Sequence, residues 1–223
     1  FGDSLDKWAG EDPKKIEFAN SIKRMAVAVG TGKDPGEAAG YGAVNSFAKN
    51  VMKDKSTAEQ EKLAAKIKEI MDLDLKNPVI EVGYRSLGLT NHSLIIISSD
   101  NQKPIVLEGM PEDQIGGIKA RTAGGGGVGY GNLIKQVVSV PNKIKLSDRQ
   151  IVSTPKGMTR EEFAKNLLIG NLLYDNNALY VDIPELSPIG ANSNSFVGSL
   201  LRLAGSDFKP NRSCWGWERD IWQ

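Results

Sequence analysis

The sequence predicts an α+β protein in which an antiparallel sheet packs with helices and an all-helical N-terminal region precedes it. The first third of the chain repeats apolar residues at helical spacing. From Asn77 onward the apolar runs become short, rich in β-branched residues and separated by Asn, Asp, Gly and Pro. A boundary near Lys76 therefore divides the chain into a helical region, residues 1–76, and a second domain, residues 77–223.

Two long helices are expected in the first region. They lie in "DPKKIEFANSIKRMAVAV" and in "STAEQEKLAAKIKEIMDLDL". Ser56 begins the second helix and Glu59 follows three residues later, which is the pattern of a capping box. Between these helices the sequence is rich in Gly and Ala and predicts a turn followed by a weakly amphipathic helix.

The second region has five short segments with the composition of strands. They are "PVIEVGYRSL", "HSLIIISS", "KPIVLEG", "LIKQVVSVP" and "NALYVDI". A helix is predicted in "TREEFAKNLLIGNLLYD", where Thr159 and Glu162 form a capping box, and another in "SFVGSLLRLAG", which ends at Gly205. The tail "CWGWERDIWQ" holds three of the four Trp residues, and we expect it to pack back onto the domain.

Composition argues against several classes of protein. Lys and Arg number 28 against 27 Asp and Glu, so the formal net charge is +1 and no overall basic field favours nucleic acid as a partner. The single cysteine, Cys214, cannot form an intramolecular disulfide, and with one histidine it cannot build a Cys/His metal cluster. No apolar run approaches the roughly 20 residues that span a bilayer, and no signal peptide is visible. Because the chain begins at Phe1 without Met, we expect a fragment of a longer protein.

A run of four short polar residues, Asn192 to Ser195, stands directly before the last amphipathic helix in "GANSNSFVGSLL". All four are preferred N-cap types, so one of them is expected to satisfy free backbone amides whatever the protein does. A helix N-terminus also suits a nucleophile, because the peptide dipoles favour a developing anion and free amides can hold an oxyanion. Ser193 is therefore either part of a cap or a nucleophile that needs a base.

His92, the only histidine, is the candidate base because its ordinary pKa lies near neutral pH. It opens an apolar strand, and alternation places Leu94 and Ile96 on its face. After the turn "DNQKP" a hairpin would bring Glu108 back across from the His92 end, where a carboxylate can fix the imidazole tautomer. The alternative for His92 is a structural residue of the core, and the alternative for Glu108 is a solvated charge at a strand end.

These residues resemble the circularly permuted papain-like superfamily, which includes lecithin retinol acyltransferase-like enzymes and some cell-wall amidases. The likeness rests on a histidine at a strand start, a polar residue on the next strand, and "NSNSFV" at a helix N-terminus, and it covers roughly residues 79–205. In those families an Asn- or Asp-flanked Cys stands three residues before an aromatic residue and a Val. Here Ser193 stands three residues before Phe196 and Val197.

The resemblance implies acyl-group hydrolysis or transfer at an amide or ester. No cofactor and no metal are expected. Ser193 would attack, His92 would take its proton, Glu108 would orient His92, and Asn192 and Asn194 would support the site and its oxyanion. The expected nucleophile of the family is Cys, so Ser193 is either a replacement that disarms the protein or the natural nucleophile of this branch. The substrate would be a peptide, a cell-wall crosslink or a lipid ester.

The Gly- and Ala-rich segment "AVAVGTGKDPGEAAGYGAVNSFAKN" resembles the segment that precedes toxin domains in contact-dependent growth inhibition and other polymorphic toxins. The usual boundary tetrapeptide Val-Glu-Asn-Asn is absent. The resemblance implies a pretoxin region at residues 1–76 and a toxin that is secreted, delivered into a target bacterial cell and neutralised by a cognate immunity protein. The alternative is a non-catalytic binding or delivery module, in which "NSNS" is only a cap and His92 a core residue.

Overall fold

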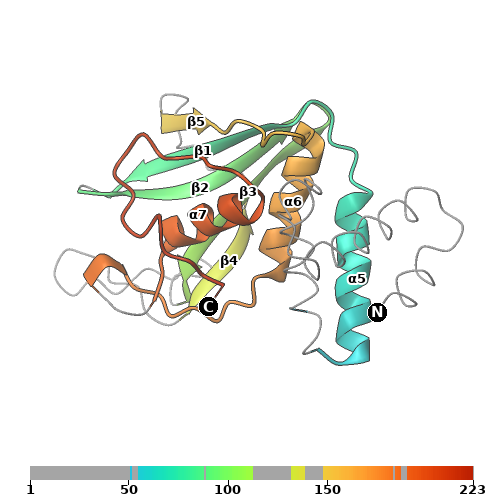
Figure 1. Ribbon diagram of the computed structural model, residues 1–223, viewed down its shortest axis with the longest axis horizontal. Coiled ribbons are helices and arrows are strands. Elements are labelled where there is room, and N and C mark those ends of the chain that lie inside the picture. The colour runs from blue at the N-terminus through green and yellow to red at the C-terminus, as the bar shows by residue number, and fades with distance from the viewer. Residues whose placement is uncertain are drawn as a thin grey trace, which may run out of the picture.

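The computed structural model describes residue 51 and residues 55–87, 89–112, 132–138, 148–182, 184–186 and 190–222 (Figure 1). The described part is an α+β protein, as the sequence predicts. Its helices are α5 (Thr57–Met71), α6 (Arg160–Leu173) and α7 (Ser193–Leu203), with the 3-10 turn η3 (Pro184–Leu186). Its strands are β1 (Val79–Ser86), β2 (Asn91–Ser99), β3 (Gln102–Pro111), β4 (Leu133–Val138) and β5 (Arg149–Ile151). Residues 1–50, which hold most of the predicted helical region, lie outside the described residues.

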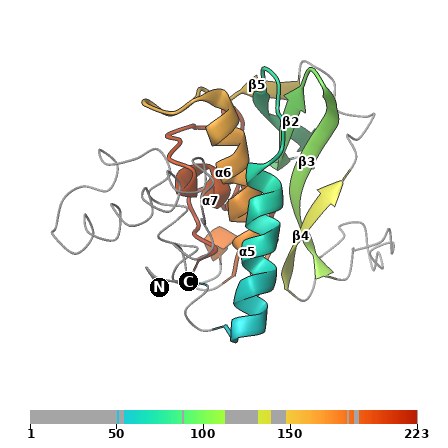
Figure 2. The same cartoon turned by 90° about the vertical axis from the view of Figure 1, so that its right-hand side faces the viewer.

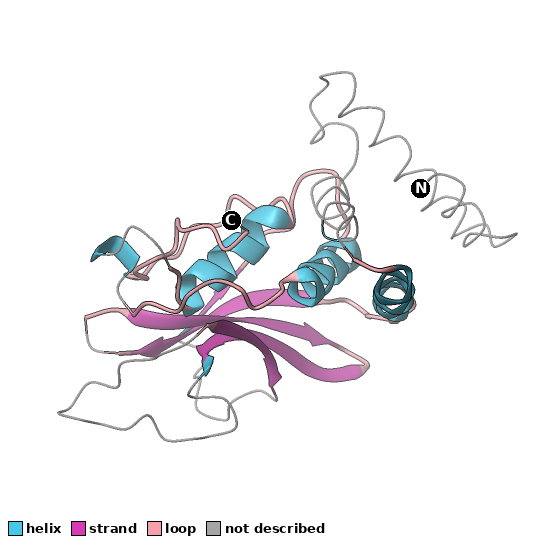
Figure 3. Ribbon diagram, turned by 90° about the horizontal axis from the view of Figure 1, so that it is seen from below, coloured by secondary structure: helices cyan, strands magenta, loops and turns pink. Residues whose placement is uncertain are grey.

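The five strands form one antiparallel sheet in the order β4-β3-β2-β1-β5. Helices α5, α6 and α7 all lie on one side of this sheet (Figure 3). Alternation along the strands separates two apolar sets. Ile95 and Ile97 of β2 join the main core under α6 and α7, whereas Leu94 and Ile96 form a smaller buried cluster with Val106. Because β2 pairs with β1 in an unbroken register, the smaller cluster lies on the opposite face.

The fifth predicted strand is wrong. Within its described residues, 177–182, the segment "NALYVDI" forms no strand but the isolated bridges Asn132↔Leu179 and Tyr180↔Ala191. Asn176, just before it, has a left-handed backbone (φ 58) and accepts a hydrogen bond from the N–H of Lys135 at 2.8 Å. The segment therefore closes the end of β4 and the approach to α7 instead of adding a strand. The sheet is completed by β5, a three-residue strand that the sequence pattern did not reveal.

Both predicted capping boxes are confirmed. The carboxylate of Glu59 accepts hydrogen bonds from the N–H and Oγ of Ser56, at 2.9 and 2.6 Å. The carboxylate of Glu162 accepts from the N–H of Thr159 at 2.7 Å, and the Glu162 N–H donates back to Thr159 Oγ1 at 3.2 Å. Each box satisfies amides that the first turn of a helix leaves free, so the starts of α5 and α6 are fixed locally.

Helix α5 belongs to the predicted pretoxin region, yet it packs along α6 (Figure 2). Ile67 is buried against Ile169 and Leu173. Lys165 of α6 also donates from Nζ to the carbonyl of Met71 at the end of α5, at 2.7 Å. The last helix before the boundary near Lys76 therefore shares a core with the second domain.

This packing predicts the outcome of limited proteolysis. We expect the smallest protease-resistant fragment to retain α5 and so to begin before Thr57, because removing α5 would expose the apolar side of α6. Mass spectrometry of the resistant fragment, followed by its thermal melt, checks this. A stable fragment that begins near residue 77 would instead support a separable region at residues 1–76.

Candidate active site

The cap of α7 is built by Asn192 and Ser195. The Oδ1 of Asn192 accepts hydrogen bonds from the N–H of Asn194 at 2.9 Å and of Ser195 at 3.1 Å. In return, the N–H of Asn192 donates to Ser195 Oγ at 3.1 Å. This is a capping box with Asn in the place of Ser or Thr, so the prediction that one of the four polar residues caps the helix is confirmed.

Asn194 has a different task, which is to tie α7 to β2. Its Oδ1 accepts hydrogen bonds from the N–H and Oγ of Ser93, at 2.9 and 2.8 Å. Its Nδ2 donates to the carbonyls of Asn91 and Trp215, at 2.8 and 2.9 Å. The pairing of β2 with β3 ends at Ile95, so Asn194 takes over backbone groups of β2 that no longer face a strand. These bonds fall on the two residues that flank His92.

Ser193 is left without such a role. It is the first residue of α7 and is 3% exposed. In the described part of the chain, neither its Oγ nor its N–H has a hydrogen-bond partner, although the next two N–H groups are taken by Asn192. A free hydroxyl and a free amide thus stand together at the positive end of the helix dipole. That is the environment that a nucleophile and an oxyanion donor require.

The side chains of Asn192 and Asn194 are not free to donate to an oxyanion. Asn192 Nδ2 donates to the carbonyls of Asp182 and Trp215, at 3.2 and 3.0 Å, and Asn194 Nδ2 is fully used as described above. In this structure the two side chains instead hold the start of α7 against β2 and the tail. The amide that remains for an oxyanion is the N–H of Ser193 itself.

His92 and Glu108 lie together, as the hairpin predicts. The imidazole Nε2 and the carboxylate Oε1 are 2.5 Å apart, and both residues are buried, with 8% and 4% exposed. The reading of Glu108 as a solvated charge at a strand end is therefore wrong. Because Glu108 occupies Nε2, the nitrogen that remains to act as a base is Nδ1, which has no hydrogen-bond partner among the described residues.

Arg85 is a third member of this cluster that the sequence reasoning missed. Its guanidinium Nη2 contacts the same carboxylate oxygen of Glu108 that faces His92. Burial, with the positive charge of Arg85, lowers the pKa of His92 below its ordinary value of 6.5, so the imidazole is neutral at neutral pH. The sequence does contain a pattern that could have revealed Arg85. A tight hairpin between "EVGYRS" and "NHSLII" places Arg85 directly across from His92.

Ser193 and His92 approach the same end of β2 from different sides. Alternation puts His92 on the face of Leu94 and Ile96, whereas Asn194, the neighbour of Ser193, reaches the strand edge from the helix-covered face. In this structure no hydrogen bond joins Ser193 Oγ to either imidazole nitrogen of His92. The described residues thus show the His92–Glu108 pair formed and the Ser193–His92 pair unformed.

The C-terminal tail packs onto α7, which confirms the expectation for its aromatic residues. Trp217 is buried in the main core, and Ser195 Oγ donates to the carbonyl of Gly216 at 2.8 Å. Gly216 has a left-handed backbone (φ 84), and a Cβ at this position would come within 2.8 Å of both Asn192 Oδ1 and Ser195 Oγ. Only glycine therefore lets the tail close over the cap of α7.

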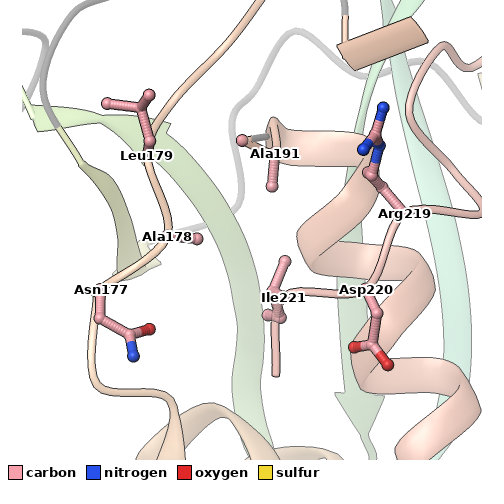
Figure 4. A pocket seen from close by; sticks show the side chains of 8 residues that line it. Asn177, Ala178, Leu179, Ala191, Arg219, Asp220 and Ile221 are labelled. Carbon is pink, nitrogen blue, oxygen red and sulfur yellow. The ribbon is translucent and has the colours of Figure 1, made fainter. Parts of the chain in front are cut away.

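A pocket lies beside the start of α7, on the side of the tail (Figure 4). Its lining is formed by Asn177, Ala178, Leu179, Gly190, Ala191, Arg219, Asp220 and Ile221. Neither Ser193 nor His92 lines it, so it is separate from the candidate catalytic groups. Gly190 and Ala191 line the pocket and directly precede Asn192, the N-cap of α7, so the chain runs from the pocket into the cap.

Comparison of the chain with protein-family models, with curated proteins and with solved structures finds no match. None of the helices in the described residues has the length and apolar character needed to cross a membrane. The described residues also contain no group of three or more His, Cys, Asp and Glu side chains arranged to hold a metal ion.

Cys214 is half-buried, and burial raises the pKa of its thiol to about 11. It has no part in the candidate site.

Proposed function

We propose that this chain is a bacterial toxin domain with a circularly permuted papain-like fold that hydrolyses or transfers an acyl group at an amide or ester. The proposal rests on the different hydrogen bonds that the four residues of "NSNS" make. Asn192 and Ser195 form the cap and Asn194 anchors β2, so capping leaves Ser193 unexplained. The buried His92–Glu108 pair, whose Nδ1 is free within the described residues, supplies the base that a serine nucleophile needs.

The reaction would begin when Ser193 Oγ attacks the carbonyl carbon of the substrate and its proton passes to His92 Nδ1. The electron pair of the carbonyl moves to its oxygen, where the N–H of Ser193 and the helix dipole stabilise the anion. Collapse of this intermediate expels the amine or alcohol, which takes the proton from Nδ1. Water or a second acceptor then releases the acyl group by the same steps in reverse.

Formation of the Ser193–His92 hydrogen bond is the step that the free protein still lacks. Catalytic hydrogen bonds are often long or absent before substrate binds and tighten in the complex. Ser193 is the first residue of its helix, so rotation about its own side-chain bonds and small shifts of the helix start change the position of Oγ. The two flanking anchors, at Asn91 and Ser93, limit how far the helix start lies from His92.

The biological setting follows the same proposal. A toxin of this kind is secreted, enters a target bacterial cell and is held inactive in the producing cell by a cognate immunity protein. Its substrate is a peptide, a cell-wall crosslink or a lipid ester. The unformed Ser193–His92 bond favours a second candidate function, a non-catalytic binding or delivery module of the same kind of toxin.

Expression in a bacterial host that lacks any immunity protein separates the two functions. We expect the wild-type chain to stop growth and His92→Ala to permit it, because without the base the serine hydroxyl remains a poor nucleophile. Growth curves of the two strains, with equal protein levels checked by immunoblot, give the measurement. The chain should be directed once to the cytoplasm and once to the periplasm. Equal growth of both strains in both compartments would favour the non-catalytic module.

A further inference from the structure

Two side chains from neighbouring strands converge on one carboxylate oxygen of a third strand. Arg85 of β1 and His92 of β2 are direct cross-strand partners, and both reach Oε1 of Glu108 on β3. The side chain of Glu108 is 6% exposed and that of His92 10%, whereas that of Arg85 is 38% exposed. The carboxylate and the imidazole are therefore buried. The Arg85 side chain is partly exposed, but its Nε and Nη2 atoms are buried with them.

The charges of this cluster decide where its protons lie. A buried carboxylate needs a positive partner, because leaving it alone in a low-dielectric interior is costly. With Arg85 present, the guanidinium neutralises Glu108 and the imidazole can stay neutral. Without Arg85, the pair would carry one net negative charge, and uptake of a proton by His92 would be the simplest way to neutralise it.

We propose that Arg85 is a positioning residue of the candidate active site: it keeps Glu108 ionised without protonating His92, so that the single imidazole proton stays on Nε2 and Nδ1 stays bare. This role rests on the proposed function, because it prepares the nitrogen that would accept the proton of Ser193. Arg85 itself touches neither the nucleophile nor the substrate in this scheme. Its effect on catalysis passes entirely through Glu108 and His92.

Other charged groups do not serve His92 in the same way. Glu81 of β1 and Arg149 of β5 lie on the same face of the sheet, and they pair with each other, with Nη1 and Oε2 3.3 Å apart. The charged groups that face the imidazole from the described strands are therefore Arg85 and Glu108. Arg149 is a matched control, because its loss removes a half-buried cation from the same face without touching Glu108.

The proton on His92 can be observed directly, since the chain has one histidine. In protein labelled with ¹⁵N, the shifts of the two ring nitrogens report which one carries the proton and at what pH the second proton binds. In the wild type we expect the proton on Nε2 and a neutral ring at pH 6. In Arg85→Met we expect the midpoint of His92 titration to rise by about one pH unit or more, since the neighbouring cation is gone. Arg85→Lys should restore the wild-type midpoint, and Arg149→Met should keep it.

Two results would overturn the proposal. One is a wild-type ring with its proton on Nδ1, and the other is an Arg85→Met titration that coincides with that of the wild type. Arg85→Gln, which keeps a polar side chain without charge, replaces Arg85→Met if the latter does not fold. The measurement needs no substrate, so a raised midpoint in a protein without acyl-transfer activity would uphold the role of Arg85 on His92 while counting against the proposed function.

Discussion

Replacing Ser193 with Ala is expected to abolish acyl-transfer activity, by about 10³-fold or more, while the protein stays folded. The hydroxyl has no hydrogen-bond partner among the described residues, and Asn192 already caps the helix. The free energy of unfolding should therefore fall by less than about 0.5 kcal/mol, below the usual cost of losing a cap. Hydrolysis of a panel of esters and amides, together with urea unfolding, gives both quantities.

Ser195→Ala is the matched control, because it also removes a serine hydroxyl from the first turn of α7, two residues further along the chain. Ser195 Oγ is bonded to the N–H of Asn192 and to the carbonyl of Gly216, so its loss should lower the free energy of unfolding by about 1–3 kcal/mol. Activity should persist at temperatures where the variant is folded. A Ser193→Ala protein as active as the wild type would rule out Ser193 as the nucleophile and leave the helix start with a structural purpose only.

Replacing Asn194 with Ala is expected to produce the largest loss of stability, about 3–5 kcal/mol in the free energy of unfolding. The residue is 2% exposed, and its amide group makes hydrogen bonds to Ser93, Asn91 and Trp215. Alanine would remove the partners of the Ser93 N–H and of the Asn91 carbonyl in a buried place, whereas the Trp215 carbonyl would keep the hydrogen bond from Asn192 Nδ2. Chemical denaturation followed by tryptophan fluorescence measures this loss, because Trp217 lies in the main core.

Asn194→Asp sharpens the test. A carboxylate keeps the acceptor for Ser93 but turns an oxygen toward the carbonyls of Asn91 and Trp215, so this variant should be no more stable than Asn194→Ala. The exposed Asn177 serves as the control, since Asn177→Ala should change the free energy of unfolding by no more than about 0.5 kcal/mol. An Asn194→Ala protein that loses less than 1 kcal/mol would show that the tie between α7 and β2 does not hold the helix start.

The local features of this protein followed from short stretches of sequence. Ser56 with Glu59 and Thr159 with Glu162 begin helices as expected, because a capping box depends on residues three apart and on nothing distant. The hairpin that joins His92 to Glu108 was also predictable, since a short turn fixes which residues return to the same end. The strand predicted in "NALYVDI" was wrong because a strand also needs a distant partner, and strand composition does not guarantee one.

The tertiary structure alone decided how the four polar residues of "NSNS" divide their tasks. Each of them is a good cap by type, so sequence could not tell which one caps, which one ties α7 to β2 and which one stays free. The choice depends on where the pairing of β2 with β3 ends, at Ile95, and on how Gly216 closes over Asn192. Both involve segments that are distant in the chain. The sequence by itself thus determined the starts of α5 and α6 and the hairpin that joins His92 to Glu108. Only packing singled out Ser193 and placed Arg85 on Glu108, because hydrogen-bond partners far apart in the chain are chosen by the fold.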